Sequence, residues 1–251
     1  MLYIVGTGPG SLAQITPRAL EAIHGSDYVV GNKLYLDMLA ENTQGKNLVI
    51  SHMGKEVERA RTAVELAQEH TVSIVSGGDA GVYGMASIVL EIVERSFPGT
   101  LVEVIPGITA ANAAASLLGS PLSSDFAVIS LSDLLTPWEK IVQRLEATFA
   151  VGIPVVLYNP KSERRPNNLT AALDIAMKHL APETPVGVVK NAFREKEEII
   201  VGTLGGMVED HSFVDMHSTV IIGGTESRIW KEGDDVRGII TPRGYNHKYV
   251  Y

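Results

Sequence analysis

The feature that most constrains this chain is a set of three glycine-containing turns, each of which follows a short apolar run rich in β-branched residues. Such runs are typical of buried parallel strands, and ligands of α/β proteins bind at the carboxyl ends of those strands. Glycine at a strand end lets the backbone approach a ligand closely or adopt a positive φ. The pattern therefore predicts a composite binding crevice. The three turns are residues 6–10, 76–84 and 105–111.

Strand-like runs alternate with helical patterns along the chain, which favours an α/β architecture. Thr16 and Pro17 have the order expected of a helix start, with threonine as the cap and proline in the first position. The turn-rich stretch 119–125 predicts a boundary between an N-terminal α/β domain, residues 1–120, and a C-terminal α/β domain with an extended tail, residues 121–251.

Apolar periodicity places further helices over several segments, and one helix is expected to begin near Tyr83. The close spacing of the last strand-like runs suggests antiparallel pairing. The tail from residue 225 onwards shows no readable period. The predicted helices are residues 56–70, 83–95, 109–118, 138–149 and 169–180, and the last strands are residues 186–189, 198–201 and 219–222.

Composition and charge narrow the classes of function. The chain has 251 residues, no cysteine and a formal net charge of −8. The lack of cysteine excludes disulfides, a thiolate nucleophile and cysteine-ligated metal sites, and the seven histidines lack metal-ligand spacing, so no metal site is expected. The net charge argues against nucleic-acid binding, and an anionic substrate would need a local basic patch. No apolar run reaches a membrane span and no signal peptide is apparent, so we expect a cytoplasmic protein.

The first turn invites comparison with the dinucleotide-binding fingerprint, but two features disagree. The third glycine comes one residue too early, and the helix begins only at Pro17, so its N-terminus would not meet a pyrophosphate. Asp27 lies at a suitable distance along the sequence, yet it precedes its strand and does not follow it. These differences argue against a NAD site. The remaining interpretations of the first turn are a purely structural turn and a loop that faces a ligand.

The second and third turns carry polar groups suited to a ligand. Glycines allow close approach, and the Asp79 carboxylate can accept hydrogen bonds from an ammonium or from hydroxyl groups. The alternative is that Asp79 caps the following helix. Thr109 opens the helix after the third turn, where capping and ligand contact can coexist.

A further side-chain amide, that of Asn159, is placed at the carboxyl end of the strand 154–158. It is followed by the basic run of Lys161, Arg164 and Arg165, in a chain that is acidic overall. This run is either a solvated face or a site for substrate carboxylates, which guanidinium groups bind in a bidentate manner. A second basic group, within residues 55–61, is better interpreted as a solvated face.

These motifs in order resemble the tetrapyrrole (corrin/porphyrin) methyltransferases, which use S-adenosylmethionine. The resemblance runs from residue 1 to about residue 224. Within that family, segments 30–35, 130–138 and 157–162 are most similar to the precorrin-3B or cobalt-factor III C17-methyltransferases of cobalamin synthesis.

The resemblance implies two α/β domains with the cofactor between them, methyl transfer to C17 of an anionic macrocycle with ring contraction, and a homodimer. Some relatives have methionine where this chain has Asn159. Ring contraction needs proton transfers, for which Ser130, Ser132 and Asp133 are candidates by position only, with a polar turn as the alternative. The implied cofactor contacts are Pro9, Gly77, Gly78, Asp79, Val82, Thr109, Ala110, Asn159 and Ala192, and the implied substrate contacts are Lys161, Arg164 and Arg165.

Other functions remain open at this point. Within the same superfamily the chain could act on another tetrapyrrole position, as in uroporphyrinogen III or precorrin-4, or methylate diphthine or ribosomal RNA. Outside it, the alternatives are a non-catalytic nucleotide-binding module and a dinucleotide oxidoreductase. Binding of S-adenosylhomocysteine, compared with NAD and ATP, separates these classes.

Overall fold

The computed structural model describes residues 1–250, and the chain forms two compact units, Met1–Ala110 and Ala111–Tyr251. The division lies ten residues before the boundary that the turn-rich stretch suggested. Helix α5 (Ala110–Leu117) belongs with the second unit because Ala111, Ala114 and Leu118 pack against Val156 in one apolar cluster. The turn-rich stretch 119–125 therefore lies inside the second unit, after its first helix.

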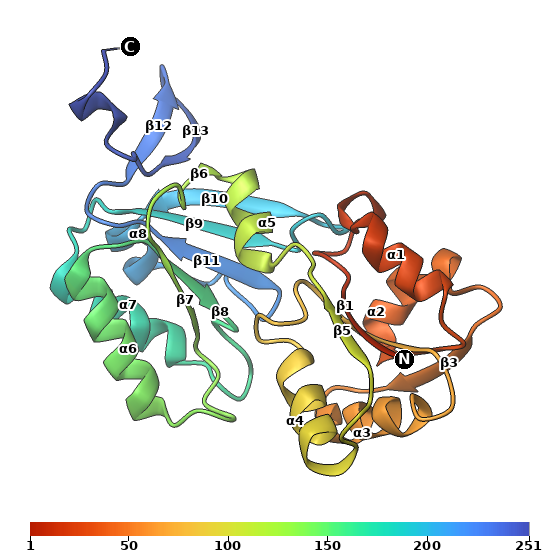
Figure 1. Ribbon diagram of the computed structural model, residues 1–251. Coiled ribbons are helices and arrows are strands. Elements are labelled where there is room, and N and C mark those ends of the chain that lie inside the picture. Colours follow the sequence, from red (N-terminus) through yellow and green to blue (C-terminus); the bar gives the residue numbers. More distant parts are fainter. Residues whose placement is uncertain (251) are drawn as a thin grey trace. The chain divides into compact units, whose positions relative to one another are not determined.

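The first unit is built on a five-stranded parallel sheet with strand order β3-β2-β4-β1-β5 (Figure 1). Its central strands are apolar because helices cover both faces. All five strands run in the same direction, so their carboxyl ends meet at one edge of the sheet. The strands are β1 (Leu2–Gly6), β2 (Tyr28–Asn32), β3 (Asn47–Ser51), β4 (Val72–Ser76) and β5 (Val102–Ile105).

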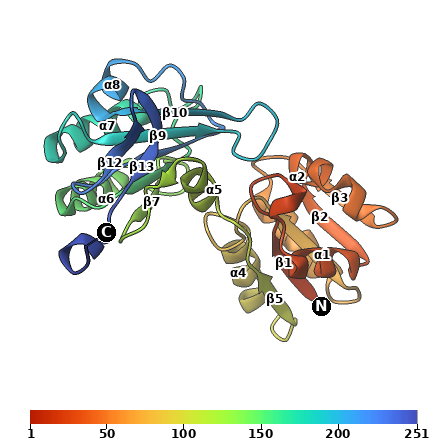
Figure 2. The same ribbon diagram turned by 90° about the horizontal axis from the view of Figure 1, so that it is seen from above.

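Alternate residues of the central strand β1 face different helix layers. Ile4 packs in the cluster with helices α3 and α4, and Val5 packs in the cluster with helices α1 and α2 (Figure 1, Figure 2). This alternation is the period of two expected of a strand buried on both faces. The helices are α1 (Pro17–His24), α2 (Lys33–Met38), α3 (Glu56–Leu66) and α4 (Ala86–Ser96), with short 3₁₀ turns at Leu12–Gln14 and Ala40–Thr43.

The predicted start of α1 is confirmed, since the Thr16 side chain accepts a hydrogen bond from the amide of Ala19 and Pro17 occupies the first turn. The predicted start of the fourth helix near Tyr83 is wrong. Tyr83 has φ of 52°, in the left-handed region, so a right-handed helix cannot include it and α4 begins at Ala86. The intervening residues form a longer loop at the carboxyl edge of the sheet.

The second unit contains a mixed five-stranded sheet with strand order β10-β9-β11-β8-β7. Strands β7 and β8 are parallel, and the pairs β10–β9, β9–β11 and β11–β8 are antiparallel, which confirms the pairing suggested by the close spacing of the last strands. The strands are β7 (Ala127–Ser130), β8 (Val155–Tyr158), β9 (Pro185–Lys190), β10 (Glu198–Thr203) and β11 (Ser218–Ile222).

Helices cover this sheet on both faces as well. Val155 and Leu157 pack with α6, α7 and α8, whereas Val156 packs with α5 on the opposite face (Figure 1). The helix predicted around residues 138–149 is confirmed, and it ends where Gly152 adopts a left-handed φ of 79°. The helices are α6 (Trp138–Val151), α7 (Asn168–His179) and α8 (Leu204–Glu209).

The tail forms a hairpin that the sequence did not predict. Strands β12 (Arg228–Glu232) and β13 (Asp235–Ile240) are antiparallel, and β13 also pairs in parallel with the short strand β6 (Gly119–Ser120). A 3₁₀ turn follows at Tyr245–His247. Among the helices of residues 1–250, none combines the length and the apolar character needed to cross a bilayer.

Candidate functional site

The three glycine turns converge at the carboxyl edge of the first sheet, as the sequence predicted. They follow β1, β4 and β5, and β1 pairs with both of the others. Gly8 and Gly78 exchange backbone hydrogen bonds: the Gly8 amide donates to the Gly78 carbonyl at 3.0 Å, and the Gly78 amide donates to the Gly8 carbonyl at 2.7 Å. The first two turns are therefore joined directly through their backbones.

Gly6 and Gly107 bring the first and third turns into backbone contact. A Cβ at Gly6 would lie 2.6 Å from the Gly107 nitrogen, and a Cβ at Gly107 would lie 2.7 Å from the Gly6 carbonyl carbon and overlap the Gly78 carbonyl oxygen. No side chain fits into this contact. These glycines are thus required for packing, which sequence reasoning could not separate from a role in ligand approach.

The Asp79 carboxylate ties the second turn to the third. Its Oδ1 accepts a hydrogen bond from the Gly81 amide at 2.7 Å, and its Oδ2 accepts one from the Gly107 amide at 2.9 Å. The alternative role as a helix cap does not apply, because the cap position of α4 is Met85 and Asp79 lies seven residues before the helix. Each oxygen still has capacity for a second donor from a ligand.

The turns also leave accessible backbone where a ligand can approach. A Cβ built on Gly78 would only reach van der Waals contact with the Thr109 Cα and the Ala110 nitrogen, both at 3.8 Å, so this glycine is less tightly enclosed than Gly6 and Gly107. Val82, on the loop before α4, is 37% exposed. The predicted cofactor residues of this unit are therefore gathered around one edge; they are Pro9, Gly77, Gly78, Asp79, Val82, Thr109 and Ala110.

In the second unit, the parallel strands β7 and β8 end at the same edge, which brings Ser130 beside Asn159. The Asn159 Nδ2 donates to the Ser130 Oγ at 2.9 Å, and the Ser132 amide donates to the same oxygen at 3.2 Å. Asn159 has φ of 51°, a left-handed conformation that asparagine tolerates better than most residues. A left-handed residue cannot continue a β-strand, so β8 ends at Tyr158, directly before Asn159.

Tyr158 was not predicted, yet it organises the start of α5. Its hydroxyl oxygen accepts a hydrogen bond from the Ala111 amide at 2.7 Å, which satisfies one of the free donors of the first helical turn. Ala192, a predicted cofactor contact, packs with Tyr158 against the apolar cluster that includes Ala111. The residue pair Tyr158–Asn159 is adjacent in sequence, but its partners are about 30 to 50 residues away, so no local pattern indicated them.

The basic run after β8 is only partly solvated. The half-buried Lys161 places its Nζ 3.4 Å from the Nδ1 of His211, whose Nε2 lies 3.0 Å from the Thr170 hydroxyl. Arg164 is exposed. Arg165 is half-buried and its Nη1 donates to the Ser132 Oγ at 3.0 Å, while its buried Nε lacks a hydrogen-bond partner among residues 1–250.

Lys190 and Asp215 form an ion pair at the same edge, with Nζ and Oδ2 2.8 Å apart. Burial raises the pKa of Asp215, but hydrogen bonds from Lys190 and from the His217 amide outweigh it, so the pKa lies below its usual range. The hydrogen bond to Asp215 raises the pKa of Lys190. Both groups are charged at neutral pH.

The second basic group, residues 55–61, contains one clear exception to the expected solvated face. Arg59 is 6% exposed; its Nη1 donates to the Ser51 Oγ at 2.8 Å, and its Nε lacks a partner within the described part of the chain. Burial lowers the pKa of this guanidinium, which the neighbouring Glu56 partly offsets. The expectation is therefore wrong for Arg59, because the side chain folds back from α3 onto the end of β3.

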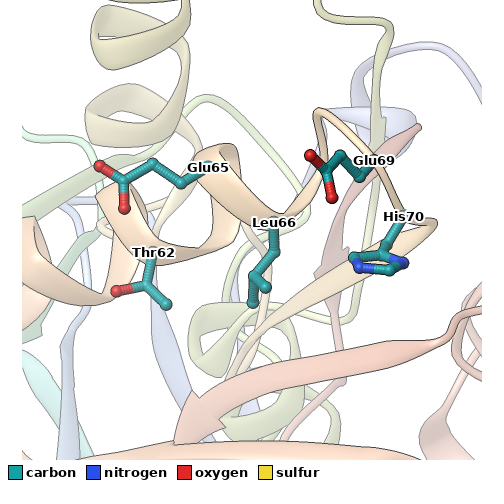
Figure 3. A pocket seen from close by; sticks show the side chains of 5 residues that line it. All are labelled: Thr62, Glu65, Leu66, Glu69 and His70. Atoms are coloured by element: carbon teal, nitrogen blue, oxygen red, sulfur yellow. The ribbon is translucent and has the colours of Figure 1, made fainter.

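A shallow pocket on the first unit lies away from these residues. It is lined by Thr62, Glu65, Leu66, Glu69 and His70, on α3 and the segment that leads into β4 (Figure 3). His70 precedes β4, so this pocket is at the amino end of the strand, whereas the glycine turns are at its carboxyl end. Ligands of parallel sheets bind at the carboxyl ends, so we assign the candidate site to the turns.

Comparison with known proteins gives consistent relationships. The family model described as Tetrapyrrole (Corrin/Porphyrin) Methylases matches residues 1–208. A probable cobalt-factor III C(17)-methyltransferase of Salmonella typhimurium is 46% identical over 98% of this chain and 99% of that protein. A cobalt-factor III methyltransferase of Priestia megaterium is 43% identical over 99% of this chain, which spans 46% of that longer protein.

Two solved structures have the same fold. The crystal structure of the methyltransferase CobJ superimposes with a TM-score of 0.89 and 31% identity, covering 96% of this chain and 99% of that one. A uroporphyrin-III C-methyltransferase from Thermus thermophilus, complexed with S-adenosylhomocysteine, superimposes with a TM-score of 0.71 and 24% identity over 88% of this chain and 96% of that one.

Proposed function

Because this chain belongs to the tetrapyrrole (corrin/porphyrin) methylase family, we propose that it is an S-adenosylmethionine-dependent C17-methyltransferase acting on cobalt-factor III or precorrin-3B, with ring contraction, in cobalamin biosynthesis. The observation that carries this proposal is the likeness, over 98% of this chain and 99% of the relative, to a protein named as a probable cobalt-factor III C(17)-methyltransferase. Convergence of the three glycine turns at one sheet edge supports a ligand site in the expected place.

The residues of the turns suit a methyl donor that carries an ammonium, a ribose and an adenine. The Asp79 carboxylate is held by two backbone amides and still has lone pairs for an ammonium or hydroxyl donor. Gly78 is half-buried and has a left-handed φ of 70°, a conformation that glycine adopts without strain, and it carries no side chain that would keep a ligand from the backbone. The proposed cofactor contacts are Pro9, Gly77, Gly78, Asp79, Val82, Thr109, Ala110, Asn159 and Ala192.

When bound, S-adenosylmethionine supplies an electrophilic methyl group to the nucleophilic ring carbon and leaves as S-adenosylhomocysteine. The chain's own contribution is then to hold the two reactants in line and to exclude water. Lys161, Arg164 and Arg165 supply positive charge for the macrocycle's carboxylates. For proton transfer during contraction, the Ser130 hydroxyl is a better candidate than Asp133, since Asn159 and the Ser132 amide fix the Ser130 oxygen and Asp133 is exposed.

The test is incubation of the purified protein with each trimethylated intermediate and S-adenosylmethionine, followed by mass and NMR analysis. One added methyl on C17 of a contracted ring supports the proposal, and the preferred substrate shows whether cobalt is inserted first. A methyl on C11 or C2, or turnover only with uroporphyrinogen III, would assign the chain to another branch of the family.

The proposal includes a cytoplasmic homodimer. Its support is the family resemblance and the absence of cysteine, which suits a reducing compartment. Light scattering of the purified protein measures the oligomeric state directly, and a monomeric mass at micromolar concentration contradicts this part of the proposal.

A further inference from the structure

The loop that connects β7 to α6, residues 131–137, carries two adjacent exposed leucines. Leu134 is 77% exposed and Leu135 is 93% exposed. A single exposed leucine is ordinary on a protein surface. Two neighbouring leucines with so little burial, however, contribute almost none of the hydrophobic free energy that their burial would add to the stability of the fold. This tip, Leu134–Leu135, therefore suits a surface that becomes covered when the protein binds something.

The base of the loop is fixed by hydrogen bonds. The Leu131 amide donates to the Tyr158 carbonyl, and the Asn168 side chain donates to the Leu131 carbonyl, both at 2.8 Å. The Ser132 amide donates to Ser130, and the Ser132 hydroxyl accepts the hydrogen bond from Arg165. The loop then enters α6 at Trp138. The leucines thus extend from an anchored base into solvent.

Position and charge indicate what covers the tip. The loop leaves β7 at the edge where β8 ends and Asn159, a proposed cofactor contact, follows it. The hydrogen bond from Arg165 to Ser132 places the basic run beside the loop. An apolar tip next to cationic side chains complements a ligand with an apolar planar body and carboxylates on its rim.

We propose that Leu134 and Leu135 contact the apolar face of the tetrapyrrole substrate, and that Arg165, besides its proposed role toward the substrate's carboxylates, holds the loop for this contact. This inference rests on the proposed function. It makes the 131–137 loop a determinant of macrocycle affinity, whereas S-adenosylmethionine affinity depends on the glycine turns.

The experiment compares the double variant Leu134→Ser/Leu135→Ser with the wild type in steady-state methyl transfer. Loss of the apolar contact should raise KM for the tetrapyrrole at least about tenfold. KM for S-adenosylmethionine should stay within about twofold. The variant Leu134→Met/Leu135→Met restores apolar area and should return KM for the tetrapyrrole close to the wild-type value.

A matched control is Leu101→Ser. Leu101 is 72% exposed and precedes β5, at the edge of the first sheet opposite the glycine turns, so its replacement should leave both KM values unchanged. Because all three leucines are exposed, the variants should have the melting temperature of the wild type. If the double variant is destabilised, the single variant Leu135→Ser replaces it in the KM measurements.

The outcomes separate the inference from the proposed function. If the wild type fails to methylate C17 of either intermediate, the proposed function fails. If the wild type turns over and the double variant keeps its KM for the tetrapyrrole, the substrate contact is wrong. A double variant with unchanged KM but an altered mass by light scattering would assign the tip to a contact between copies of the chain and overturn the inference.

Discussion

The backbone contact between Gly6 and Gly107 leads to a strong prediction for Gly107→Ala. The added methyl would overlap the Gly78 carbonyl oxygen and lie 2.7 Å from the Gly6 carbonyl carbon, both of which are backbone atoms of neighbouring turns. Overpacking of this kind costs about 1–3 kcal/mol. Displacement of the third turn also weakens the hydrogen bond from the Gly107 amide to Asp79, which contributes about 1 kcal/mol or more.

We therefore expect Gly107→Ala to lower the free energy of unfolding by about 2–4 kcal/mol and to weaken S-adenosylhomocysteine binding at least about tenfold. Urea titration measures the first quantity and calorimetry the second. The control is Gly202→Ala in β10, where a Cβ meets nothing within 4 Å and stability should hardly change. Unfolding within about 0.5 kcal/mol of the wild type, with unchanged affinity, would refute the close-packing argument.

Three further predictions follow from side-chain contacts. Asp79→Ala removes the acceptor for two backbone amides, so it should cost about 1–3 kcal/mol in urea titration and weaken S-adenosylhomocysteine binding in calorimetry; unchanged affinity would exclude Asp79 from the cofactor site. Arg165→Ala should raise KM for the tetrapyrrole and leave S-adenosylhomocysteine affinity unchanged, because it removes a proposed partner of the substrate's carboxylates and frees Ser132 at the loop base; a loss of both would indicate general disruption. For Asp215, a folded pKa below the unfolded value means that the ion pair with Lys190 stabilises the fold above about pH 4 and that this contribution is lost as pH falls through the folded pKa. Asp215→Asn should therefore lower the melting temperature slightly at pH 7, by an amount equivalent to at most about 1 kcal/mol, and this gap should close as the pH falls through the folded pKa of Asp215; a gap that stays constant as the pH is lowered would contradict this assignment.

Much of the architecture was encoded locally. The order of strand-like runs and helical patterns predicted the α/β class, the helix start at Thr16 and Pro17, the α6 helix and the antiparallel strands, because each of these depends on the period of side chains along one segment. The three glycine turns predicted a common edge, because parallel strands end on the same side of a sheet.

Elements that depend on distant partners were not predicted. The hairpin β12–β13 is mostly exposed and pairs with β6, more than 100 residues earlier, so its segment has no apolar period of its own. The start of α4 at Ala86 depends on the left-handed Tyr83, a conformation that residue type alone does not indicate. The second unit includes α5 because this helix packs on Val156, whereas the local composition suggested a domain boundary after the helix.

For the site, the sequence by itself determined which residue types stand at the strand ends and, through its motifs, the family to which the chain belongs. Only the tertiary structure decided what those residues touch. It showed that Asp79 joins two turns, that Arg165 donates a hydrogen bond to Ser132, and that Arg59 is buried. The physical reason is that a polar side chain's role depends on which donors and acceptors reach it, and here these come from segments far apart in the sequence.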